Sequence, residues 1–126
     1  MNWLAVLAGG AIRSALRYAI AGMWLAPGSQ NFPWGTMIVN VTGSMALGFL
    51  GRYFASPHGS PAMFLFLTVG ICGGYTTFST FTLDAFAMAE RGAATRATLY
   101  ILASVVLSYV ALFAGYAFAR ALRPQL

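Results

Sequence analysis

Residues 70–81 read Gly-Ile-Cys-Gly-Gly-Tyr-Thr-Thr-Phe-Ser-Thr-Phe and lie inside a long apolar segment of the chain. Adjacent glycines and a run of hydroxyl-bearing, β-branched residues are poor helix formers. Inside a bilayer, a broken helix is tolerated only where its backbone is buried in protein or lines a water-filled cavity. The stretch predicts either a helix interrupted in mid-membrane or an intact helix packed closely through Gly73 and Gly74, and we favour the interruption.

The composition of the whole chain favours a bilayer as its solvent. Of its 126 residues, 60% are hydrophobic and 7% are charged, whereas a soluble domain carries about 25% charged residues. The charged residues are seven arginines, Asp84 and Glu90, which give a formal net charge of +5. The arginines are scattered, which argues against a basic nucleic-acid-binding patch. A single cysteine, Cys72, excludes an internal disulfide framework and a cysteine-rich metal site.

Three stretches that contain Gly or Pro, residues 27–33, 56–61 and 90–92, divide the chain into four apolar segments. Gly and Pro favour turns, so these stretches are interpreted as loops. Each segment is mostly apolar and reaches the length of roughly 20 residues that a membrane-spanning helix needs. We predict an all-α membrane protein with one four-helix transmembrane domain over 1–126, with helices at about 3–25, 33–54, 62–89 and 93–120.

The arginines near the segment ends hardly favour one orientation in the membrane. One side of the membrane would carry the N-terminus, the 52–61 loop and the C-terminus. The arginines divide as Arg52, Arg120 and Arg123 on that side, against Arg91 and Arg96 on the other. The Lys/Arg bias sets orientation, so a chain with almost no bias can insert both ways. An antiparallel dimer would then supply the inverted symmetry that many transporters carry within one chain.

Two segments carry polar side chains at helical spacing. Each set follows an i, i+4, i+8 pattern, which places its members on one helix face. A polar group in hydrocarbon must find a partner, so the sets indicate either hydrogen bonds between packed helices or the lining of an ion path. Hydroxyl and amide groups can donate hydrogen bonds to an anion. The sets are Thr36, Asn40 and Ser44, and Tyr100, Ser104 and Ser108.

Two other pairs of residues share helix faces. Phe78 and Phe81 lie beside the predicted interruption; such rings normally contact lipid or core, but their weakly positive edges can also meet a small anion. Arg13 and Arg17 lie four residues apart inside the first segment, where they should face protein or water. These internal arginines, without a basic region before the segment, argue against a cleaved signal peptide.

Asp84 and Glu90 lie toward the end of the third segment, and we interpret them as solvated groups at the membrane interface. The sequence contains no nucleophile–base pair, phosphate loop or metal-binding triad. We therefore do not expect an enzyme.

Two stretches of the sequence closely resemble the signature stretches of the Fluc/CrcB fluoride channels. They are residues 35–44, Gly-Thr-Met-Ile-Val-Asn-Val-Thr-Gly-Ser, and residues 73–81, Gly-Gly-Tyr-Thr-Thr-Phe-Ser-Thr-Phe. The Gly9-Gly10 pair followed by Arg17-Tyr18 fits the first helix of that family, and the Tyr100, Ser104, Ser108 ladder fits the fourth. The resemblance spans essentially the whole chain, although Tyr75 occupies a position that is usually aliphatic in the family.

The resemblance implies an antiparallel, dual-topology homodimer with two fluoride pores. It also implies a central structural Na⁺, not transported, that backbone carbonyls of Gly73 and Thr76 from both subunits would hold. A hard cation with oxygen ligands is chemically sensible. The implied fluoride path follows Asn40, Phe78, Phe81, Tyr100, Ser104 and Ser108, with Thr36, Thr80 and Arg17 as further candidates. Arg13 lies outside the matched motif and inherits no role.

The implied function is passive, fluoride-specific export across the bacterial cytoplasmic (inner) membrane, which reduces fluoride toxicity. The alternative is a small multidrug-type proton-coupled exporter, which needs a carboxylate within a helix, usually the first. The first segment here has arginines and no acid. A third reading, a non-conducting assembly subunit, leaves the polar sets without a purpose.

Overall fold

The structure is a computed structural model that describes residues 2–24, 32–54 and 60–124. Helices account for almost all of these ranges, in agreement with the predicted all-α class. Three long helices are α1 (Asn2–Trp24), α2 (Trp34–Tyr53) and α6 (Ala94–Leu122). The third segment is divided into α3 (Pro61–Leu65), the π-helical η1 (Phe66–Cys72), α4 (Gly73–Tyr75) and α5 (Phe78–Glu90).

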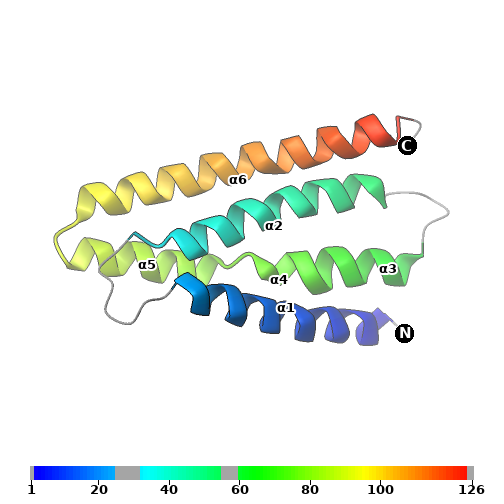
Figure 1. Cartoon of the computed structure of the whole chain (residues 1–126), viewed down its shortest axis with the longest axis horizontal. Coiled ribbons are helices and arrows are strands. Elements are labelled where there is room, and N and C mark those ends of the chain that lie inside the picture. The colour runs from blue at the N-terminus through cyan, green and yellow to red at the C-terminus, as the bar shows by residue number, and fades with distance from the viewer. Residues whose placement is uncertain (1, 25–31, 55–59, 125–126) are drawn as a thin grey trace.

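The helices lie roughly side by side as an up-and-down bundle (Figure 1). α1 runs in the same direction as the row formed by α3, η1, α4 and α5, whereas α2 and α6 run in the opposite direction. Contacts join α2 to α6, α1 to η1 and α5 to α6. The divided row therefore packs against other helices on more than one side, and the chain enters and leaves the bundle at the same end.

Of the described helices, α6 is the one that is long and apolar enough by itself to cross a membrane. Its 29 residues reach roughly 43 Å at 1.5 Å per residue, against a hydrocarbon core of about 30 Å. α2 has 20 residues, but its glycines, threonines, serine and asparagine lower its apolar character, and the third segment is divided. The four membrane spans therefore stay a prediction.

The turn between α5 and α6 is the predicted break that the structure describes in full. Gly92 has a φ of +80°, a left-handed conformation that Gly adopts at little cost. The amide of Ala93 donates to the carbonyl of Met88, and the amide of Gly92 donates to that of Ala89, each at 3.0 Å. These two bonds form a Schellman motif. The other two predicted loops, 27–33 and 56–61, lie mostly outside the described residues.

Glycines let α2 and α6 approach until their backbones touch. A Cβ at Gly48 would lie 2.1 Å from the carbonyl oxygen of Leu112, and one at Gly115 would lie 2.0 Å from that of Met45. Small residues at membrane helix crossings permit such close contact, which strengthens dispersion attraction. Gly48 and Gly115 therefore have a packing role, and the crossing fixes which face of α6 meets α2.

We expect Gly48→Ala to destabilise the protein by about 1–3 kcal/mol, because the new methyl group would push the two backbones apart. The matched control is Gly51→Ala on the same helix, where a Cβ has nothing within 4 Å; it should be neutral or slightly stabilising, since Ala is the better helix former. Thermal unfolding in detergent measures both. Equal melting temperatures for the two variants would contradict the close crossing.

Candidate functional site

The site begins at the interruption between α4 and α5. Thr76 (φ −68°, ψ 143°) and Thr77 (φ −136°, ψ 109°) are extended, so the helix that starts at Pro61 ends at Tyr75. The Thr77 hydroxyl accepts a hydrogen bond from the amide of Thr80 at 3.0 Å, which caps the first turn of α5 in the usual manner of a threonine N-cap. Thr77 is buried, so the interruption lies within packed protein on this side.

Asn40 on α2 anchors the interruption. The Thr77 backbone amide donates to the Asn40 side-chain Oδ1 at 2.9 Å. Because a backbone N–H can only donate, the acceptor at this position must be the amide oxygen. The Asn40 NH₂ group is therefore the part of the side chain left to donate to another partner. The sequence left two roles open for Asn40, a hydrogen bond between helices and a ligand contact. This geometry is compatible with both.

A groove of about 400 Å³ opens beside the anchor. It runs between α2, the interruption, the start of α5 and the middle of α6. Most of its lining is apolar, and the rest is polar but uncharged. No charged residue of the described chain lines it. The residues that line it are Asn40, Ser44, Leu47, Thr76, Thr77, Phe78, Phe81, Ser104, Val105, Ser108, Tyr109 and Leu112.

The groove brings together five of the six residues of the implied path: Asn40, Phe78, Phe81, Ser104 and Ser108. The sixth, Tyr100, is fully buried beyond the groove and contacts the Phe81 ring at a centroid distance of 5.2 Å. Residues 100, 104 and 108 thus form one inward face of α6, as their spacing predicts.

Two hydroxyls on this face lack hydrogen bonds within the described chain. The Tyr100 hydroxyl and the Ser104 Oγ are buried without a partner of good geometry, and Ser104 is 3% exposed. A buried polar group without a partner costs about 1–3 kcal/mol, so such groups call for an explanation. A ligand with hydrogen-bond acceptor character would satisfy the Ser104 hydroxyl from the groove.

Phe78 and Phe81 differ in their surroundings. Phe81 is 8% exposed and belongs to a small core cluster with Met37 and Tyr100, whereas Phe78 is 78% exposed at the outer side of the groove. Their ring centroids lie 5.9 Å apart. The two rings therefore line one side of the groove, from its exposed edge at Phe78 to the buried Tyr100 beside Phe81.

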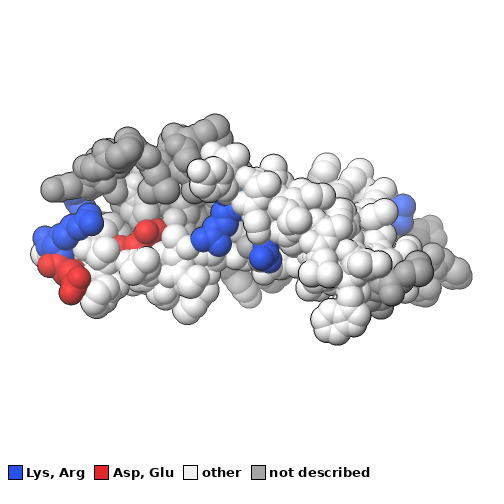
Figure 2. Space-filling model, turned by 90° about the horizontal axis from the view of Figure 1, so that it is seen from below, with Lys and Arg blue, Asp and Glu red and all other residues white. Residues whose placement is uncertain are grey.

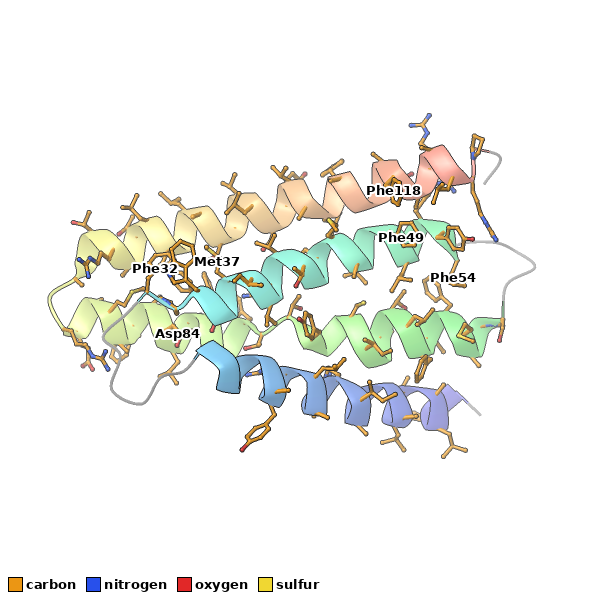
Figure 3. The ribbon with its side chains drawn as sticks, viewed as in Figure 1. Phe32, Met37, Phe49, Phe54, Asp84 and Phe118 are labelled. Atoms are coloured by element: carbon orange, nitrogen blue, oxygen red, sulfur yellow. The ribbon has the colours of Figure 1, made fainter. Side chains whose placement is uncertain are left out.

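The interpretation of Asp84 as a solvated group at the membrane interface is wrong. It lies in the middle of α5, is half-buried, and accepts a hydrogen bond at 2.7 Å from the Thr36 hydroxyl; Figure 3 shows it directed toward the start of α2. Thr36 and Asp84 are also the polar side chains beside the buried Tyr100 hydroxyl. Thr36, a path candidate from the sequence, therefore binds Asp84 and does not line the groove.

The position of Asp84 in the sequence could have indicated that it faces the bundle. Asp84 follows Phe81 by three positions and Thr80 by four, so it shares a helix face with both. Glu90 ends α5 and is exposed, as expected for an interfacial acid.

Arg17 and Thr80, the other two further candidates, contact each other. The Arg17 Nη2 donates to the Thr80 Oγ1 at 2.6 Å and joins α1 to α5. Figure 2, which views the bundle from the α1 side, shows basic side chains about halfway along the molecule as well as at its ends. A guanidinium in this position raises the local concentration of anions, although it is not part of the groove lining.

The described chain holds no group of three or more His, Cys, Asp or Glu side chains that could bind a metal. Backbone oxygen is the alternative donor. Helix termini leave carbonyls without intrahelical partners, and the helix that ends at Tyr75 has its terminal carbonyls in the stretch that contains Gly73. Gly73 has no side chain and is exposed, so its backbone is accessible from outside the single chain, whereas Thr76 is half-buried. These donors fit a small hard cation.

Comparison with known proteins gives concordant results. Residues 4–116 match the profile of the family described as CrcB-like protein, Camphor Resistance (CrcB). A protein of Nitrobacter winogradskyi named fluoride-specific ion channel FluC is 52% identical over 122 residues, which cover 91% of this chain and 94% of that protein. The Rhizobium meliloti protein of the same name is 51% identical over 121 residues, 94% of this chain and 96% of the relative.

We expect Thr36→Val and Asp84→Ala to be coupled in a double-mutant cycle by about 1 kcal/mol or more, because each removes one partner of the same hydrogen bond to a carboxyl group. Thermal unfolding of the single and double variants measures the coupling. The control pairs Thr36→Val with Thr82→Val, whose hydroxyl bonds only to carbonyls of its own helix, and should be additive. Additivity in the first cycle would refute the contact.

Proposed function

This chain belongs to the CrcB-like family, and from this membership we propose that it is a fluoride-specific ion channel that exports fluoride passively across the cytoplasmic membrane. The family is one of channels and not of enzymes. The observation that carries the proposal is the groove of neutral donors and ring edges in a helical, strongly apolar membrane protein. Passive loss of fluoride that entered as HF would reduce its toxicity to the cell.

The chemistry of the groove suits a small anion that must bind and leave. Fluoride is strongly hydrated, and the groove offers replacements for water: the NH₂ of Asn40, the hydroxyl groups of Ser104 and Ser108, and the ring edges of Phe78 and Phe81. Neutral donors bind an anion less tightly than a fixed positive charge would. Conduction requires such sites, because the ion must also be released. Narrow sites would disfavour the larger chloride.

The order of contacts suggests a route. The exposed Phe78 and the amide of Asn40 receive the ion, Phe81 contacts it next, and the buried hydroxyl ladder that ends at Tyr100 carries it onward. Arg17, held by Thr80, draws anions toward this part of the bundle.

The proposal includes an antiparallel homodimer with two such pores. Two features support it: the near-even division of arginines between the ends of the helices, and the interruption, whose exposed Gly73 would otherwise present its backbone to lipid. A second copy would cover that backbone. Reporter fusions at the C-terminus should give signal from both sides of the membrane; signal from one side alone would defeat the dual topology.

The proposal also includes a structural Na⁺ at the interruption. The carbonyls of Gly73 and Thr76 from two copies would provide a set of hard oxygen donors, and the bound charge would hold the copies together. Side chains are not required for this site, so Tyr75 is no obstacle to it.

The decisive experiment is efflux from liposomes. We expect the purified protein to release fluoride rapidly and chloride negligibly from K⁺-loaded liposomes in which valinomycin balances charge, because narrow sites would disfavour the larger chloride. Ion-selective electrodes measure both ions, with protein-free liposomes as the control. Equal release of the two anions, or release of neither, would refute a fluoride channel.

Asn40→Asp and Phe81→Ile should each slow fluoride efflux at least about tenfold while the dimer still assembles. Asp keeps an oxygen for the Thr77 amide but replaces the NH₂ donor with a negative oxygen, and Ile removes the ring edge. Electrode recordings and size-exclusion chromatography test flux and assembly. Phe113→Ile, at an exposed ring on α6, is the control; unchanged flux in both path variants would reject the assigned route.

A further inference from the structure

Arg13 is a charged residue in the middle of α1 for which the proposed function has no use. It is half-buried, and the structure gives it no hydrogen bond or ion pair with any other described residue. A charge within a membrane segment is costly and usually marks a functional position. Its surroundings can be derived from its two neighbours on the same helix face.

Gly9 and Arg17 bracket Arg13 on α1, one turn to each side. A Cβ at Gly9 would lie 2.8 Å from the Cα of Gly70, and the Arg17 side chain reaches Thr80. Residues four apart share a helix face, so Arg13 faces the same row as these two contacts. α1 and that row run in the same direction (Figure 1), which places Arg13 level with the stretch between residues 70 and 80.

That stretch contains the interruption. The helix that starts at Pro61 ends at Tyr75, and the C-terminal end of a helix carries a partial negative charge because its last carbonyls have no partners. A guanidinium at this level supplies a positive charge where the carbonyls of Gly73 and Thr76 would bind a cation. Two positive charges in one weakly screened region repel each other.

We propose that Arg13 is a built-in cation that stabilises the carbonyl end at the interruption and thereby weakens the binding of Na⁺ there. The inference rests on the Na⁺ site of the proposed function and concerns how tightly that site holds its ion. For two unit charges roughly 10 Å apart at an effective dielectric constant of about 20, Coulomb repulsion corresponds to a change of about tenfold in the Na⁺ concentration needed for half-saturation.

The test is a Na⁺ titration of the full-length protein in detergent, with N-methyl-D-glucamine as the replacement cation and melting temperature and the fraction of dimer as readouts. Arg13→Gln and Arg13→Met should reach half of their Na⁺-dependent stabilisation at a concentration about tenfold lower than wild type. Arg13→Lys keeps the charge and should resemble wild type. Arg96→Gln, at an exposed position in the first turn of α6, is the matched control and should leave the midpoint unchanged.

Midpoints within about twofold for wild type and both neutral variants would overturn the proposal, as would an Arg13→Lys midpoint equal to that of Arg13→Gln. Failure of both neutral variants to form a dimer at any Na⁺ concentration would also overturn it, because removal of a repulsive charge should strengthen the site. If neither the melting temperature nor the fraction of dimer changed with Na⁺ concentration, both the proposed Na⁺ site and this inference would be refuted. Fluoride efflux, measured separately, keeps these outcomes distinct from a failure of the channel function.

Discussion

The hydrogen bond between the Thr77 amide and the Asn40 side chain stabilises the part of the chain on which the groove depends. A helix that stops inside a bilayer leaves backbone donors and acceptors without partners, and hydrocarbon offers none. Here the donors at the start of α5 are met by a side chain of α2 and by the Thr77 hydroxyl. The interruption is thereby stabilised within the bundle. The Asn40 side chain that accepts this bond through its oxygen also contributes its NH₂ group to the groove.

The position of α6 depends on a different constraint, the contact of its backbone with that of α2 at Gly48 and Gly115. Backbone contact leaves little freedom of rotation or translation between the two helices. The face of α6 that carries Tyr100, Ser104 and Ser108 is consequently held toward the groove, where the Ser104 hydroxyl has no hydrogen-bond partner among the described residues. Close packing of small residues and exposure of donors to a ligand are two results of one helix crossing.

The few charges of the chain gain meaning from their placement. The groove lining is uncharged, while Arg17 and Asp84 each bond to a hydroxyl on a neighbouring helix, at Thr80 and Thr36. Such pairing reduces the cost of a charge within the bundle, and the polar groups that line the groove are neutral. Arg13 is different because it has no hydrogen bond or ion pair with another described residue, although it lies four residues from Arg17 on the same face of α1.

The sequence by itself determined the helical class and the inward faces, because the 3.6-residue period is a local property. It also placed Asn40 and the hydroxyl ladder on shared helix faces, since polar groups at helical spacing are conspicuous in an apolar chain. Only the tertiary structure decided that Thr36 bonds to Asp84, that Tyr100 is buried behind Phe81, and that Arg13 lies level with the interruption. These facts depend on the register between helices distant in sequence, which backbone contact at a few glycines sets and no local pattern encodes.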